Sequence, residues 1–148
     1  MLESKNIKYI LLSSTGVSAQ NIGGKTIHSA LKIRQYNDHY QTLILDDEKS
    51  KIELLKIKTI IIEETSMVSS ELLTFISNIF SSLHKNHKPF EGISILTVGD
   101  LAQLPPINGQ QIFHSPVWKL FFPLFLSQPK RQKNDPDFYN LLQKLRFG

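Results

Sequence analysis

KTIIIEETSM, residues 58–67, joins an apolar run rich in β-branched residues directly to two glutamates. A short apolar run of this kind predicts a buried β-strand. Carboxylates at the end of a buried strand are costly unless they serve a metal ion or a reaction, so Glu63 and Glu64 are candidates for a functional site. The alternative interpretation is that both acids lie in solvent and cap the helix that follows.

Two further apolar runs predict strands before and after this one, YILLS (9–13) and ISILTV (93–98). Helical patterns lie between the runs, one over residues 26–33 and one after Ser69, which is a predicted N-cap. Strands that alternate with helices predict an α/β fold, with a mainly parallel sheet flanked by helices.

The remaining segments complete this outline. Residues 36–57 are polar and charged, and they are predicted to form a surface excursion. The aromatic cluster Trp118, Phe121 and Phe122 is predicted to be core. A last helix is predicted to begin at Asp135-Pro136, because aspartate caps helices and proline fits their first position.

Composition limits the class of protein. The chain has 148 residues, 41% of them hydrophobic, a net charge of +4 and no cysteine. These values predict one soluble domain, permit a nucleic-acid partner, and exclude disulfides and thiolate metal sites. The longest apolar run, at 117–126, is short and interrupted by Lys119 and Pro123. We therefore expect an intracellular protein with no membrane partner.

A second group of polar residues follows the third predicted strand, where Gly99-Asp100 precedes Gln103. In parallel sheets the chemistry gathers at the carboxyl ends of the strands. In nucleotide hydrolases one acid at such a strand end helps to hold Mg²⁺, and its neighbour orients the attacking water. A glutamine amide nearby can hydrogen-bond the terminal phosphate.

Four segments, in this order, carry a resemblance to a known family: STGVSAQNIGGKTIHS (14–29), IIIEETSMVS (60–69), HKPFEGISILTVGDLAQLPPI (87–107) and KRQKNDPDFYNLLQKLRFG (130–148). Together they resemble the PIF family of superfamily-one DNA helicases, which are relatives of the RecD-like helicases. The resemblance extends from about residue 8 to residue 148.

The resemblance implies a function and a domain. It implies 5′–3′ translocation on single-stranded DNA driven by ATP with Mg²⁺, and unwinding at DNA duplex junctions. Residues 1–148 would be a partial RecA-like motor domain, the first of two. The family's first strand and its phosphate loop would lie outside these residues. In a eukaryote the protein would act in the nucleus or the mitochondrion.

AQNIGGKT, residues 19–26, nearly matches a phosphate-binding loop, with Ala19 in place of the first glycine. A phosphate loop must leave its strand directly, whereas STGVS stands between the first predicted strand and this segment. In the family the corresponding segment lies along the DNA. Gly23 and Gly24 would then serve a tight turn or a close backbone approach.

The resemblance assigns the nucleotide side as follows. Glu63 stands where the family usually has the aspartate that binds Mg²⁺, and Glu64 matches the catalytic acid. Gln103 matches the glutamine that senses phosphate, and Asp100 would hold its loop or a water near the metal. Arg131 matches the arginine that reaches the terminal phosphate. The alternatives are a helix-start acid for Glu64, a loop amide for Gln103 and a basic surface patch around Arg131.

The DNA side rests on small polar groups and exposed backbone, which suit phosphate contacts without sequence readout. The candidates are Thr15, Gly16, Asn21, Gly24, His28 and Pro105. His28 could instead be structural, and Pro105 could simply turn the chain. His84 and His87 are spaced i, i+3, but the sequence offers no third ligand beside them, so we expect no metal site there.

Two alternative functions remain open from the sequence. The first is a non-catalytic helicase relic, or a module that binds single-stranded DNA without motor activity. The second is a small kinase that uses Ala19–Thr26 as its phosphate loop. The second predicts that Lys25→Ala abolishes ATP binding, whereas the helicase interpretation predicts little direct effect.

Overall fold

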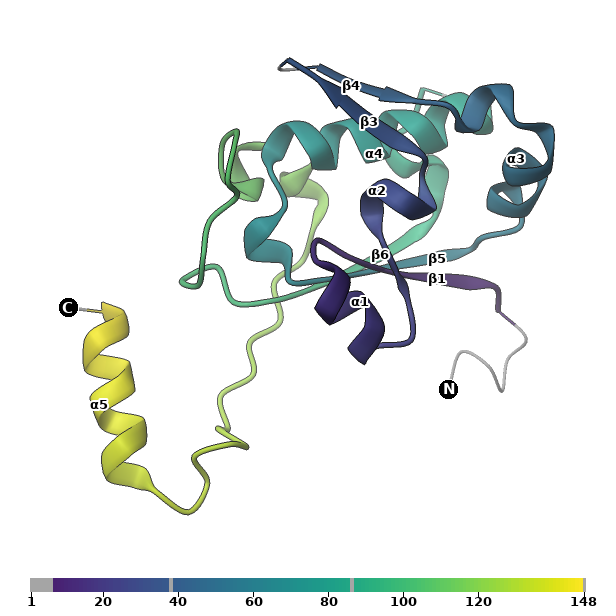
Figure 1. The fold of residues 1–148 in the computed structure, drawn as a ribbon. Helices are drawn as coiled ribbons and strands as arrows, with labels where there is room; N and C mark the ends of the chain where they lie inside the picture. Colours follow the sequence, from purple (N-terminus) through teal and green to yellow (C-terminus); the bar gives the residue numbers. More distant parts are fainter. Residues whose placement is uncertain (1–6, 38, 86, 148) are drawn as a thin grey trace.

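The computed structural model describes residues 7–37, 39–85 and 87–147 of the chain. Its centre is a four-stranded parallel sheet in the order β2-β1-β5-β6 (Figure 1). These strands are Lys25–Thr26, Tyr9–Ser13, Thr59–Glu63 and Ser94–Val98, respectively. The α/β class, the three predicted strands and their parallel arrangement are therefore confirmed, and β2 is a short addition at one edge.

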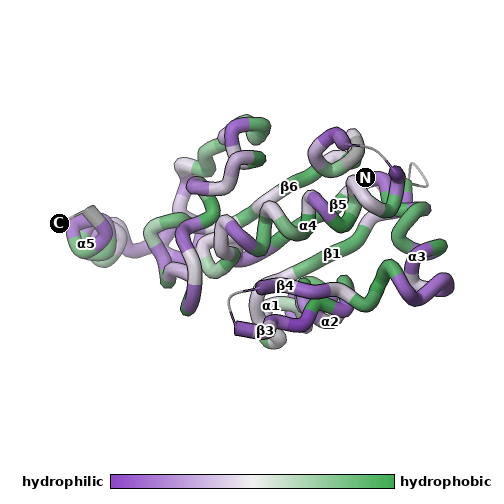
Figure 2. Tube along the Cα trace, turned by 90° about the horizontal axis from the view of Figure 1, so that it is seen from above, coloured by the Kyte–Doolittle hydropathy of each residue, from purple (hydrophilic) through white to green (hydrophobic). Residues whose placement is uncertain are grey.

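Helix α4 (Ser70–Leu83) supplies the main partner of the sheet. Figure 2 shows it lying over the apolar strands β1 and β5. Ser69 is its N-cap, as predicted, and accepts a hydrogen bond from the Leu72 N–H at 3.1 Å. The fully buried core side chains on these elements are Leu12, Ile60, Ile62, Leu73, Ile76 and Phe80.

The segment after β1 is less helical than the sequence predicts. Helix α1 (Gly16–Asn21) leads into β2, and helix α2 is confined to Ile27–Ala30. The predicted helix over 26–33 is thus wrong at both ends. Thr26 belongs to β2, and the helix ends before Lys32, whose φ of 48° is left-handed.

The predicted polar excursion over 36–57 is also more structured than expected. It includes most of the antiparallel hairpin formed by β3 (Ile33–Tyr36) and β4 (His39–Thr42), and helix α3 (Glu48–Leu55). Ile44 and Leu54 are buried in the core, so this segment contributes to the fold and is not wholly surface.

The C-terminal part leaves the body of the molecule. Trp118 and Phe121 pack against the core, as predicted, but Phe122 is 85% exposed, so its assignment to the core is wrong. An irregular stretch then leads to helix α5 (Pro136–Phe147), which lies apart from the sheet (Figure 1). Asp135 caps α5 by accepting the Phe138 N–H at 2.9 Å, as predicted.

Short 3₁₀ turns link these elements: Ile44–Asp46, Thr65–Met67, Pro89–Gly92, Ile112–His114 and Trp118–Leu120. Within the described ranges, no helix is long and apolar enough to cross a membrane.

Candidate functional site

Glu63 and Glu64 lie at the edge of the sheet where the neighbouring strands also end. The register pairs Glu63 with Ser13 of β1 on one side and with Val98 of β6 on the other. Asp100 follows β6 by two residues at the same edge. The sequence predicted this juxtaposition of the acids and the Gly-Asp segment, and the structure confirms it. The chemical roles of these residues remain predictions.

Serine hydroxyls hold the acidic strand end in place. The Ser18 hydroxyl of α1 donates a hydrogen bond to the Glu63 carboxylate. The hydroxyls of Ser13 and Ser14 donate to the backbone carbonyls of Glu63 and Glu64, at 3.5 and 3.2 Å. Sequence reasoning missed Ser18, because its partner lies 45 positions away and no local pattern joins the two.

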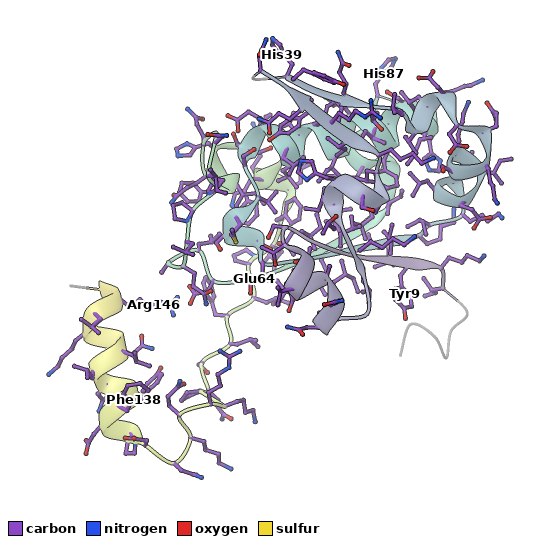
Figure 3. All side chains as sticks on the ribbon, viewed as in Figure 1. Tyr9, His39, Glu64, His87, Phe138 and Arg146 are labelled. Atoms are coloured by element: carbon purple, nitrogen blue, oxygen red, sulfur yellow. The ribbon has the colours of Figure 1, made fainter. Side chains whose placement is uncertain are left out.

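The backbone of Glu64 is left-handed, with φ 56° and ψ 49°. Residues with a Cβ, apart from asparagine and aspartate, usually avoid this region, and such strain tends to occur at functional sites. The conformation turns the chain from β5 into the 3₁₀ turn at Thr65–Met67. Figure 3 shows Glu64 at the edge of the sheet that faces the C-terminal stretch. The turn thus places Glu64, which is half-buried, just beyond the end of β5.

Gly99 is required by a close approach between the two strand ends. A Cβ at this position would lie 2.7 Å from the backbone nitrogen of Thr65. The Thr65 hydroxyl also donates to the Val98 carbonyl at 2.9 Å. The glycine therefore lets the loop after β6 pack against the turn that carries Glu64.

Asp100 organises the loop that carries Gln103. Its carboxylate accepts the Ala102 N–H at 3.1 Å, and its carbonyl accepts the Gln103 N–H at 2.9 Å. The same carboxylate forms an ion pair with Arg146 of α5. Gln103 itself is exposed. Of the two sequence interpretations for Asp100, the contacts favour the one in which it holds the loop.

The acids suit a magnesium ion that is bound mainly through a nucleotide. No cluster of three or more His, Cys, Asp or Glu side chains suitable for a metal occurs in the part of the chain that the structure describes. Mg²⁺ usually takes one or two protein carboxylates and completes its shell with waters and phosphate oxygens. The Glu63 carboxylate, oriented by Ser18, fits this type of donor.

Arg131 stands apart from the acids. It is exposed and lies on the irregular stretch before α5. Figure 1 shows this stretch running away from the end of the sheet. The structure thus brings together Glu63, Glu64 and Asp100 but does not bring Arg131 to them.

The predicted DNA segment follows β1 and runs through α1 and β2 into α2. Thr15 caps α1 by accepting the Ser18 N–H at 3.2 Å, Gly16 begins this helix and Asn21 ends it. Gly24 lets the backbone lie close to β1, because a Cβ at this position would be 2.5 Å from the Leu11 carbonyl oxygen. Thr15 and Gly24 therefore have structural roles that do not depend on DNA.

Two further DNA candidates occupy different places. His28 lies in α2, its ring centroid 6.3 Å from that of Tyr40, and burial lowers the pKa of His28. Pro105 lies in the exposed loop after Gln103, which also carries Leu104 and Ile107 at 72% and 89% exposure. Apolar side chains this exposed suit contact with a ligand or another surface.

AQNIGGKT does not have the geometry of a phosphate loop. Ala19 and Asn21 belong to helix α1, whereas Lys25 and Thr26 form strand β2 beside β1. A phosphate loop runs from a strand into the N-terminus of a helix, and this segment runs from a helix into a strand. The structure therefore favours the interpretation in which Gly24 permits close packing.

Comparisons with known proteins identify the family. A family model described as PIF1-like helicase matches residues 1–148. The ATP-dependent DNA helicase PIF1 of Saccharomyces cerevisiae is 33% identical over 147 residues, which cover 92% of this chain and 17% of that protein. The ATP-dependent DNA helicase Pif1 of Campylobacter jejuni is 36% identical over 159 residues, which cover 94% of this chain and 34% of that protein.

A solved structure agrees with these relatives. The crystal structure of Pif1 helicase from Bacteroides in complex with ADP-AlF3 and single-stranded DNA superposes with a TM-score of 0.82 at 29% identity. The match covers 94% of this chain and 36% of that chain. The 148 residues thus span about a sixth to a third of the two curated relatives. On the family match, the sequence identity and the shared fold, this chain belongs to the PIF1-like helicase family.

Proposed function

We propose that this chain is part of the first motor domain of an ATP-dependent DNA helicase. The whole protein would translocate 5′ to 3′ on single-stranded DNA and unwind duplex junctions. The observation that carries the proposal is the shared strand-end edge, where Glu63 of β5 and Glu64 just after it meet the Gly99-Asp100 segment after β6. The relatives named ATP-dependent DNA helicase support the reaction.

The chemistry at this edge would be phosphoryl transfer to water. When bound, MgATP supplies the phosphoryl group that water attacks. Glu63 would bind the metal with the carboxylate that Ser18 orients. Glu64 would orient the attacking water and accept its proton, and Gln103 would hydrogen-bond the terminal phosphate. Arg131 would stabilise charge on that phosphate, which requires its stretch to move toward the strand ends.

The open edge of the sheet supports a larger domain. In the described ranges β6 pairs with β5 on one side. Leu96 and Val98 of β6 are 47% and 43% exposed. Phe125 and Leu126, in the irregular stretch before α5, are 90% and 96% exposed. Unpaired edges and apolar surface of this kind are normally covered. We propose that the strand and phosphate loop implied by the family pack here.

Single-stranded DNA would bind along residues 15–28, through Thr15, Gly16, Asn21, Gly24 and His28, with Pro105 at a neighbouring loop. The Bacteroides relative is solved with single-stranded DNA, which supports this class of ligand. Contacts of this type are made to the phosphate backbone, so affinity should depend on salt and not on sequence.

The test is the anisotropy of a labelled oligothymidine titrated with the 148-residue chain. We expect binding that weakens as salt rises, with a slope of about −0.7 per phosphate contact. Asn21→Ala and His28→Ala should each weaken binding about threefold to tenfold, the value of one hydrogen bond. His114→Ala, the same histidine-to-alanine change at an exposed position outside the segment, is the matched control. Equal affinity in all these variants would contradict the proposed DNA surface.

A relic that binds DNA without motor activity is the second candidate. It shares the DNA surface but leaves Glu64 without a function. Glu64→Gln in a longer form of the protein that includes the family's phosphate loop separates the two. The motor interpretation expects ATP hydrolysis that this variant loses while it retains DNA binding, whereas a relic binds DNA and hydrolyses no ATP with either residue.

A further inference from the structure

Arg146 connects the C-terminal helix to the loop that presents Gln103. Asp100 folds this loop back on itself by accepting the N–H groups of Ala102 and Gln103 at 3.1 and 2.9 Å. Such aspartate turns fix the direction of the backbone that follows. The Arg146 guanidinium donates to the same carboxylate oxygen, Oδ1, that accepts the Ala102 N–H.

The partners of this ion pair come from distant parts of the molecule. They are 46 positions apart in the sequence, and α5 lies well separated from the sheet except at its last turn (Figure 1). Figure 3 shows Arg146 extending from α5 toward the body of the molecule. The side chains of Arg146 and Asp100 are 37% and 27% exposed, so water and salt screen the pair only in part.

The stretch held by this contact also carries Arg131. Arg131 lies five positions before Pro136, the first residue of α5, and the helix itself is a rigid rod of twelve residues. A contact at the far end of α5 therefore restricts where the stretch around Arg131 can lie. The apolar side chains between the body and Arg131 do not anchor it, since Leu124 and Phe125 are 79% and 90% exposed.

We propose that Arg146 is a positioning residue that couples the loop after β6 to the C-terminal helix. Through Asp100 it stabilises the loop that presents Gln103, and through α5 it restricts the stretch that carries Arg131. The proposal rests on the proposed function for the roles of Gln103 and Arg131. The contact of Arg146 with Asp100, and its effect on the loop and on α5, can be tested without nucleotide or DNA.

The first test measures exchange of single backbone amides with water by NMR. In Arg146→Gln, which removes the charge and keeps a polar side chain, we expect the amides of Ala102 and Gln103 to exchange about fivefold faster. Arg146→Lys should restore part of the protection. The amides of Ile61 and Leu96, within the sheet, are the internal controls and should not change. Equal acceleration at all four amides would mean a global loss of stability and would overturn the proposal.

The second test measures where α5 lies. The chain has no cysteine and one tryptophan, so a dye on Asn140→Cys in α5 reports energy transfer from Trp118 alone. We expect Arg146→Gln to change the transfer efficiency, and the exchanged pair Asp100→Arg with Arg146→Asp to restore it. The exchanged pair should not restore slow exchange of the Ala102 amide, because Asp100→Arg removes the carboxylate that accepts its N–H.

These results separate the inference from the proposed function. Arg146→Gln should weaken oligothymidine affinity less than Asn21→Ala does, because most of the proposed DNA contacts lie in residues 15–28 and only Pro105 lies in the loop that Arg146 supports. Unchanged energy transfer together with unchanged Ala102 exchange in Arg146→Gln would overturn the inference even if DNA binds as proposed. Failure of DNA binding with both effects present would overturn the DNA surface and leave the inference standing.

Discussion

Gly99 shows how a single residue shapes this site. Because an added Cβ would lie 2.7 Å from the Thr65 backbone nitrogen, Gly99→Ala forces the two strand ends apart. We expect a loss of about 1–3 kcal/mol in the free energy of unfolding, as for other overpacked sites. Gly16→Ala is the control, since nothing lies within 4 Å of its Cβ, and it should change stability by less than about 0.5 kcal/mol. Urea unfolding followed by circular dichroism measures both, and equal stabilities would contradict the close approach.

His28 predicts a dependence of stability on pH. Partial burial lowers the pKa of His28 below 6.5, so the folded state binds a proton less readily than the unfolded state. The stabilisation from the neutral ring is therefore fully present above pH 6.5, and it is lost as the pH falls from there through the folded pKa. His28→Gln should flatten the curve of unfolding free energy against pH in this window. An unchanged slope in the variant would mean that another group is responsible.

At the scale of elements, helix α4 depends on its cap. Ser69 is buried and accepts the Leu72 N–H at 3.1 Å, so Ser69→Ala leaves a buried donor unsatisfied. We expect a loss of about 1 kcal/mol in the free energy of unfolding. Ser82→Ala makes the same chemical change at an exposed position of α4 and should have little effect. Thermal melts of the two variants test this, and equal melting temperatures would argue against the cap.

The elements that the sequence predicted well are those with strong local patterns. The β-branched run at 58–62 and the stripe after Ser69 correspond to β5 and α4. Strand β2 was missed because two residues carry no periodicity, and they pair with β1 only because Gly24 permits the approach. Core residues in the polar 36–57 segment were missed for a similar reason, since single apolar side chains such as Ile44 give no pattern.

The site was predictable where it follows strand ends and unpredictable where it depends on distant contacts. Acids at the end of β5 and a Gly-Asp pair after β6 must share an edge once both strands are parallel neighbours. The contacts of Ser18 with Glu63 and of Arg146 with Asp100 span 45 and 46 positions. No local spacing rule reaches that far, so these partners emerge only from the folded structure.

At the scale of the whole molecule, the chain offers candidates for some of the groups that ATP hydrolysis needs and not for others. Hydrolysis needs a phosphate cradle, a metal with an activating acid, and charge neutralisation on the terminal phosphate. Glu63 and Glu64 offer the second, and Arg131 offers part of the third. A cradle would need a strand that runs directly into a helix through a glycine-rich loop, and AQNIGGKT instead runs from α1 into β2.

We therefore expect that the 148-residue chain by itself does not hydrolyse ATP at a useful rate. Without cradle N–H groups and their lysine, the triphosphate is not held in line for attack, and positioning supplies much of the rate. The measurement is phosphate release with and without single-stranded DNA, beside Glu64→Gln and Lys25→Ala. Hydrolysis that DNA stimulates and that both variants lose would contradict this expectation. Because Lys25 belongs to AQNIGGKT, loss of hydrolysis in Lys25→Ala would identify this segment as the phosphate loop, although it runs from a helix into a strand. That outcome would favour the alternative in which Ala19–Thr26 binds the phosphates of ATP.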